Sequence, residues 1–204
     1  MAFKMSVQKY SGKISEVEVG TGEKTIKIGG ENVLPFYSFD GEAGNTQKVG
    51  IEISDVYPEG WTDSFKEMYK EVAHCPVKWA KHVEANTAAD FICLKLESAD
   101  PNGLDKTPED CAQIAKQVAE AVSLPIVIAG CGNHEKDGKL FEKVAQAVDG
   151  HNCLFLSATE DNYKAVGAAT TMAYSHKVSA ESSVDINLAK QLNVLLGQLG
   201  VKSE

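Results

Sequence analysis

Five short apolar segments, separated by stretches with helical periodicity, constrain the fold of this chain more than any other feature. They are residues 49–53, 90–96, 125–130, 153–157 and 176–180. Near-continuous apolar runs of this length are typical of strands that are buried on both faces of a parallel sheet. Strands that alternate with helices in this order predict an α/β fold with a parallel sheet.

The segments between these strands carry apolar residues at the spacing of an amphipathic helix. A helical stretch broken by Pro76 is expected between residues 61 and 84, and further helices are expected after Thr107, Thr159 and Asp185. We predict that these last three residues cap the helices that follow them, because their side-chain oxygens can accept hydrogen bonds from free amide groups in the first turn.

The N-terminal part of the chain has a different pattern. Residues 15–19 and 25–28 alternate apolar and polar side chains, and the glycines between these two segments can form a turn. We therefore predict two domains, an N-terminal β extension over residues 1–45 and an α/β domain over residues 46–204.

Two α/β architectures are compatible with five strand–helix units. One is an open doubly wound sheet, which five strands can complete. The other is a (β/α)8 TIM barrel, which needs eight units and about 250 residues, so that five units would form an unfinished barrel. Hydrophobic periodicity alone does not distinguish between the two.

The composition excludes several classes of function. The formal net charge is −9 and the sequence pI is ≈ 5.1, without a cluster of Lys and Arg, so we expect no nucleic-acid partner. No segment approaches the roughly 20 apolar residues of a membrane span, and the N-terminus has no signal-peptide pattern. We therefore expect a cytoplasmic protein without a membrane partner.

The cysteines and most histidines carry no pattern of a metal or disulfide site. The five cysteines are widely spaced and include no Cys-x-x-Cys pair, which predicts neither a disulfide framework nor an iron-sulfur cluster held by this chain. We expect surface or capping roles for His74, His82, His151 and His176.

Small and polar residues follow four of the predicted strands, at the edge where parallel α/β folds bind ligands. The predicted ligand-binding residues are Glu97, Asp100, Gly130, Cys131, Gly132, Asn133, Thr159, Asn162, Ser182, Asp185 and Asn187. They would form a shallow polar rim suited to a broad ligand, although residues of these types also serve as helix caps. Lys95 and Glu97 lie on the same side of their strand, either as a stabilising charged pair or as ligand contacts.

Residues 130–134 raise two further hypotheses about chemistry. Gly130-Cys131-Gly132 begins like a dinucleotide fingerprint, but Glu135 occupies the position that requires the last glycine. Cys131 and His134 could be a nucleophile and a base, or two metal ligands, but the sequence shows no third orienting group and no second ligand pair. We therefore predict no catalytic residue and no metal site.

Several segments that follow one another along the chain carry a family resemblance. They are residues 31–36 with 39–42, 89–96 with 99–101, 125–132 with 135–137, 160–164, and 184–187 with 190–193. Taken together, they resemble the small subunit of the corrinoid iron-sulfur protein, which is the delta-type subunit of acetyl-CoA decarbonylase/synthase. The resemblance implies a (β/α)8 barrel with about five of the eight βα units present, hence a chain truncated at its C-terminus.

The resemblance also implies a function in anaerobic one-carbon metabolism, in the Wood-Ljungdahl pathway. The large subunit of the heterodimer would carry the iron-sulfur cluster and a mobile corrinoid (cobalamin) domain. This chain would be a non-catalytic subunit that caps the corrinoid at the interface. Methyl groups would come from methyltetrahydrofolate through a separate methyltransferase and would pass on to acetyl-CoA synthase.

Two alternative functions remain at this point. A pterin-binding methyltransferase of the same barrel class would need polar side chains around the pterin, for which Asp100, Asn133, Asp185 and Asn187 are candidates. An open-sheet oxidoreductase is the weaker alternative, because the dinucleotide fingerprint is incomplete.

Overall fold

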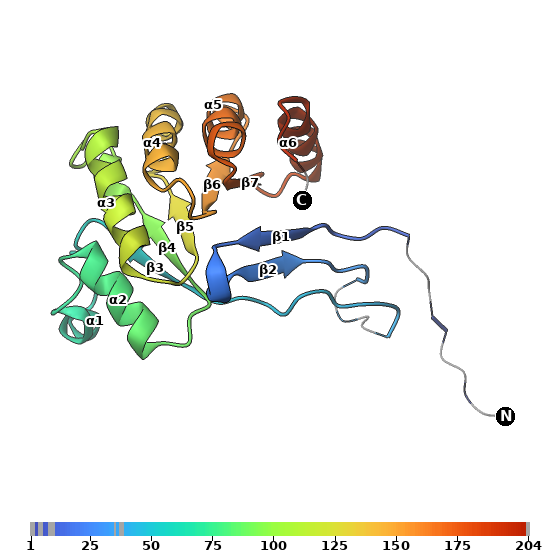
Figure 1. The fold of residues 1–204 in the computed structure, drawn as a ribbon, viewed down its shortest axis with the longest axis horizontal. Coiled ribbons are helices and arrows are strands. Elements are labelled where there is room, and N and C mark those ends of the chain that lie inside the picture. Colours follow the sequence, from blue (N-terminus) through green and yellow to red (C-terminus); the bar gives the residue numbers. More distant parts are fainter. Residues whose placement is uncertain (1–2, 4–5, 8–10, 35, 37–38, 203–204) are drawn as a thin grey trace.

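A five-stranded parallel sheet forms the centre of the molecule (Figure 1). The computed structural model describes residues 3, 6–7, 11–34, 36 and 39–202. The strands of this sheet lie in the order of the chain and are β3 (Gly50–Ser54), β4 (Phe91–Lys95), β5 (Ile126–Ala129), β6 (Leu154–Ala158) and β7 (Lys177–Ala180).

Helices connect these strands and pack along one face of the sheet (Figure 1). They are α1 (Asp63–Tyr69), α2 (Pro76–Asn86), the 3-10 turn η2 (Glu97–Ala99), α3 (Pro108–Ala121), α4 (His134–Ala147), α5 (Tyr163–Gly167) with the π-helical turn η3 (Ala168–Met172), and α6 (Ile186–Gln198). Because parallel crossovers are right-handed, strands in consecutive order place all their connecting helices on the same face.

The sheet is open, so the expectation of a (β/α)8 TIM barrel with five of its units is wrong for this structure. Among the described residues, β3 and β7 each pair with one strand only and form the two edges of the sheet. Five strands are too few to curl a sheet until its first and last strands meet. The doubly wound alternative is not observed either, because it requires a reversal of strand order that places helices on both faces.

One row of side chains across the sheet forms the centre of the hydrophobic core. Ile53, Leu94, Ile128 and Phe155 are register partners on successive strands, and each is fully buried. The ring of Phe155 packs edge-on against that of Phe141 on α4, with ring centroids 5.3 Å apart. The alternating side chains of β3 to β6 therefore hold the sheet against its helices.

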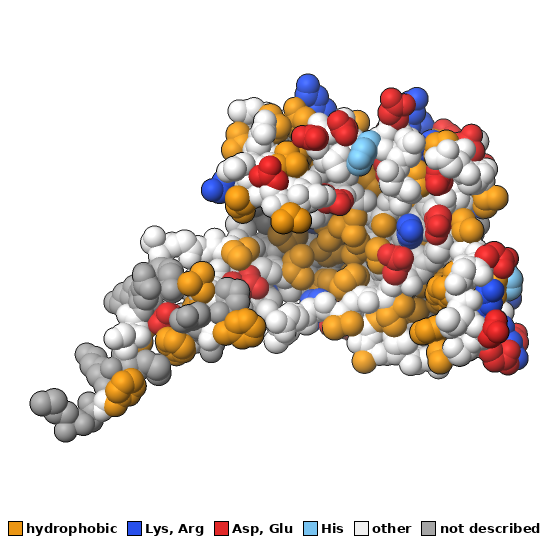
Figure 2. Space-filling view, turned by 180° about the vertical axis from the view of Figure 1, so that it is seen from behind, with side chains coloured by type: hydrophobic (Ala, Val, Ile, Leu, Met, Phe, Trp, Pro, Cys, Tyr) orange, Lys and Arg blue, Asp and Glu red, His pale blue; other side chains and the backbone are white. Residues whose placement is uncertain are grey.

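The opposite face of the sheet is not covered by helices. Side chains at the alternate positions, among them Cys93, Leu154 and Leu156, remain partly exposed. Figure 2 shows this face from behind, with hydrophobic side chains gathered in a hollow between the body and the N-terminal arm.

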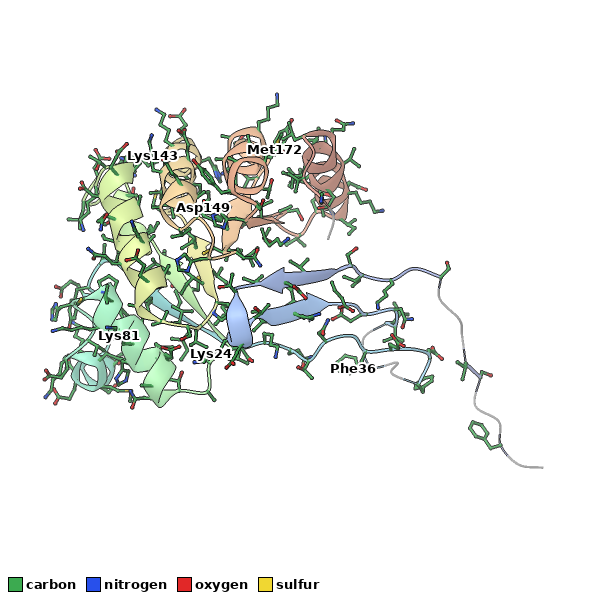
Figure 3. All side chains as sticks on the ribbon, viewed as in Figure 1. Lys24, Phe36, Lys81, Lys143, Asp149 and Met172 are labelled. Atoms are coloured by element: carbon green, nitrogen blue, oxygen red, sulfur yellow. The ribbon has the colours of Figure 1, made fainter. Side chains whose placement is uncertain are left out.

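The N-terminal arm contains an antiparallel hairpin of β1 (Glu16–Val19) and β2 (Ile26–Gly29), joined by the 3-10 turn η1 (Gly22–Lys24). Its base is attached to the amino ends of the strands of the sheet. The side-chain amide of Asn152 donates to the carbonyls of Glu18 and Gly20 at 3.0 and 3.1 Å. Lys24 pairs with Glu84 of α2 at 2.9 Å, and Figure 3 shows Lys24 at this base.

His176 departs from its expected surface or capping role, because it is buried between β6, β7 and α4. The backbone amide of Cys153 donates to its Nδ1 at 3.2 Å, and its Nε2 lies 3.0 Å from the carbonyl oxygen of Ala145. Burial lowers the pKa of His176, so the ring is held neutral with its hydrogen on Nε2.

Candidate functional site

The carboxyl ends of the parallel strands lie along one edge of the sheet, and every predicted ligand-binding residue lies in a segment that follows a strand at this edge. Glu97 and Asp100 follow β4, residues 130–133 follow β5, Thr159 and Asn162 follow β6, and Ser182, Asp185 and Asn187 follow β7. We call this the carboxyl rim. An open pocket of about 560 Å3 at the rim is lined by Gly132, Asn133, His134, Glu135 and Asp161. Ligand contact by any rim residue stays a prediction.

Two of the expected helix caps are present, and a third residue takes the same role. Thr107 accepts from the amide of Asp110 at 3.2 Å, and Asp185 accepts from the amides of Asn187 and Leu188 at 2.8 and 3.2 Å. Asn133 caps α4 in the same way, as its side-chain oxygen accepts from the amide of Lys136 at 3.0 Å. The oxygens of Asn133 and Asp185 are thus already engaged within the rim.

The prediction that Thr159 caps a helix is wrong. Helix α5 begins only at Tyr163, and Asn162 is the residue at its N-cap position. The buried side-chain oxygen of Asn162 accepts from the backbone amide of Thr159 at 2.8 Å. Asn162 therefore fixes the turn after β6 instead of facing solvent.

The loop after β5 is organised by Asp137, a residue that sequence reasoning missed. Its buried carboxylate accepts from the backbone amides of Cys131 and Gly132 at 2.8 and 3.0 Å. A Cβ atom at Gly130 would lie 2.4 Å from this carboxyl group, which explains the need for glycine there. An acidic residue in the first turn of a helix that follows a glycine-rich loop is the sequence signal that could have identified it.

Cys131 is not arranged as a nucleophile. Its thiol donates to Asp137 at 3.2 Å, while His134 lies 3.4 Å from the hydroxyl of Thr159 instead. Burial, together with the hydrogen bond to the Asp137 carboxylate, raises the pKa of the Cys131 thiol to about 11. The reactive thiolate form is therefore scarce at neutral pH.

We expect Cys131 to react slowly with iodoacetamide. With a pKa of about 11, roughly one thiol in a thousand is ionised at pH 8, so alkylation should be about a hundredfold slower than that of glutathione. Replacement of Asp137 by asparagine removes the carboxylate that raises this pKa and should speed the reaction. Peptide mass spectrometry of timed samples measures both rates.

The matched control for this experiment is Asp149→Asn, which removes an exposed carboxylate beyond the end of α4. It should leave the rate at Cys131 unchanged. Equal rates in the wild type and in Asp137→Asn would contradict the role assigned to the Asp137 carboxylate.

The loops after β3 and β4 are joined by polar contacts that involve Glu97 and Asp55. The side chain of Ser54 donates to Glu97 at 3.2 Å, and Lys95 lies 3.8 Å from the same carboxylate. Asp55 accepts from both the backbone amide and the hydroxyl of the buried Ser98. Lys95 and Glu97 thus form the charged pair considered from the sequence, and the half-exposed Glu97 remains accessible to a ligand.

The described residues show neither a metal-binding cluster nor a membrane-spanning helix. Within them, no three or more His, Cys, Asp or Glu side chains converge on a position for a metal ion. Likewise, none of the helices in the described part has the length and apolar character needed to cross a membrane.

Comparison with known proteins places these features in a family. The family described as "CO dehydrogenase/acetyl-CoA synthase delta subunit" matches residues 16–203. The acetyl-CoA decarbonylase/synthase complex subunit delta of Methanocaldococcus jannaschii is 35% identical over 202 residues, covering 96% of this chain and 49% of the relative. The subunit of the same name from Methanothermobacter thermautotrophicus is 31% identical over 204 residues, covering 99% of this chain and 52% of the relative.

A third relative shows a similar level of identity. Subunit delta 1 of Methanosarcina thermophila is 33% identical over 195 residues, covering 92% of this chain and 44% of the relative. The chain spans about half the length of the curated relatives that it matches. With a family match over nearly its whole length, the chain belongs to the CO dehydrogenase/acetyl-CoA synthase delta subunit family.

Proposed function

We propose that this chain acts as a corrinoid-facing subunit of an acetyl-CoA decarbonylase/synthase complex and takes part in methyl transfer without catalysing it. The observation that carries the proposal is the family match over residues 16–203. Its partners would be a large subunit that holds the corrinoid and an iron-sulfur cluster, a methyltetrahydrofolate methyltransferase, and acetyl-CoA synthase.

The chemistry of the carboxyl rim fits a cap better than a catalytic centre. The rim carries small residues such as Gly132 and Ser182, polar residues such as the exposed Glu97 and the partly exposed Asp100, and an open pocket beside Gly132. The Cys131 thiol is protonated at neutral pH and bonded to Asp137, so it does not compete as a cobalt ligand or a nucleophile. These residues could contact the edge of a broad, polar macrocycle and exclude water from it.

The corrinoid would supply a strongly nucleophilic cobalt for the transfer of the methyl group. The residues of this chain would have the simpler task of covering the ring and of releasing it when the corrinoid domain moves to another partner. Glu97, Asp100 and Gly132 would bind and orient the macrocycle edge.

The alternative function, a pterin-binding methyltransferase, receives less support from the geometry. Two of its four candidate pterin ligands use side-chain oxygens inside the rim, because Asn133 and Asp185 cap helices. A pterin would have to compete for these acceptors or use their remaining lone pairs.

Anaerobic co-expression with a candidate large subunit tests the proposal. We expect a tag on this chain alone to co-purify the large subunit together with cobalt and iron, and the chain expressed alone to be colourless. Recovery of the chain without the large subunit would contradict the proposal. Binding of methyltetrahydrofolate by the chain alone, measured by calorimetry, would instead favour the methyltransferase.

A further inference from the structure

Side-chain contacts join each neighbouring pair of segments along the carboxyl rim. Besides Asp55 with Ser98 and His134 with Thr159, Asp105 pairs with Lys136, and Ser157 donates to Glu181. These contacts link the segments after β3 and β4, β4 and β5, β5 and β6, and the end of β6 with the segment after β7. The rim is therefore braced along its whole length.

The contact between Asp105 and Lys136 is an ion pair that joins two neighbouring loops of the rim. The ammonium of Lys136, in the first turn of α4, lies 2.6 Å from Asp105 in the loop before α3. The Lys136 side chain is only 20% exposed, so it lies largely against the protein where it connects the two loops. Asp105 has a φ of 45°, a conformation that Asp and Asn tolerate better than most residues.

We propose that Lys136 is a positioning residue that holds the loop after β4 against the loop after β5 and so preorganises the carboxyl rim for the corrinoid-bearing partner. The inference rests on the proposed function. A loop that is already fixed loses less conformational freedom when a ligand binds, so a brace strengthens binding without touching the ligand. Lys136 directly follows Glu135, one of the residues that line the open pocket of the rim.

The experiment measures the affinity of the chain for its large subunit, with and without bound cobalamin, by biolayer interferometry under anaerobic conditions. Lys136→Met keeps the aliphatic stem of the side chain and removes its charge, and Asp105→Asn removes the partner charge while tolerating the same backbone. Each single variant should weaken binding of the cobalamin-loaded subunit about three- to tenfold. Binding of the cobalamin-free subunit should change by less than about twofold, because the rim loops then have no cobalamin to bind and their preorganisation gives no advantage.

A double-mutant cycle separates positioning from direct contact. If the brace acts as a unit, the variant with both substitutions should bind as weakly as either single variant. Lys136→Arg, which keeps charge and reach, should bind like the wild type. Lys70→Met is the matched control, because Lys70, at the C-terminal end of α1, pairs with Glu67 of the same helix at the same 2.6 Å distance, and it should leave affinity unchanged.

Hydrogen exchange gives an independent measure of the brace. In Lys136→Met, the amides of the loops after β4 and β5 should exchange faster, while those of β4 and β5 stay protected. Unchanged affinity and exchange in both single variants would overturn the inference while leaving the proposed function intact. Additive losses in the double variant would also overturn it, since they indicate direct ligand contacts. Failure of the wild type to bind the large subunit would reject the proposed function itself.

Discussion

Replacement of Phe155 by alanine is expected to lower the free energy of unfolding by about 3–5 kcal/mol, the usual cost of removing a buried phenylalanine ring. Phe155 is fully buried at the centre of the sheet, in contact with the rings of Phe141 and His176 at centroid distances of 5.3 Å each. Its removal leaves a cavity that rigid neighbours on β6 and α4 cannot fill.

Urea unfolding followed by circular dichroism measures this loss. Phe65→Ala is the matched control, because Phe65 on α1 is 53% exposed and should change stability by less than about 1 kcal/mol. Similar losses for the two substitutions would show that Phe155 is not at the centre of the core.

The stability of the chain should fall as the pH decreases below about 6.5, the ordinary pKa of histidine, because of His176. Burial lowers the pKa of His176 in the folded state, so the unfolded chain binds a proton more readily than the folded chain. The stability that the neutral His176 ring contributes is thus fully present above the ordinary pKa of histidine and is lost as the pH falls below that value. A protonated ring would also direct a second hydrogen at the amide of Cys153.

Unfolding measured at pH 7.5 and at pH 5.5 tests this expectation. His176→Ala should cost about 2–4 kcal/mol at pH 7.5, because it creates a cavity and leaves buried backbone groups unpaired. The variant should also lose much of the difference between the two pH values. His74→Ala, which removes an exposed ring stacked on Tyr57, should keep that difference. Equal pH dependence in the wild type and in His176→Ala would contradict the assignment.

Much of the local structure could be predicted from the sequence, because hydrophobic periodicity reports which residues face a core. The five predicted strands lie within two residues of those observed, and Pro76 separates two helices as expected. The closure of the sheet could not be predicted in this way. Periodicity describes the face of each strand, whereas closure depends on how many strands pair, and the implied barrel geometry was therefore wrong.

The site was predictable in its location but not in its internal bonds. Parallel strands bring their carboxyl ends to one edge, so the residues after each strand had to lie together. Which polar atoms pair there depends on loop conformation. The buried Asp137 carboxylate and the Asp105–Lys136 brace join residues whose partners no periodic pattern identifies.

The attachment of the N-terminal hairpin has a consequence for synthesis of the chain on the ribosome. The hairpin emerges first, but Asn152, whose side chain bonds to Glu18, is translated 134 residues later. The hairpin must therefore wait outside the ribosome without this part of its docking surface while the later strands of the sheet are still being made. A slow stretch of codons before Asn152 would prolong that exposure, and chaperones that recognise nascent β-structure would have their longest opportunity to bind there.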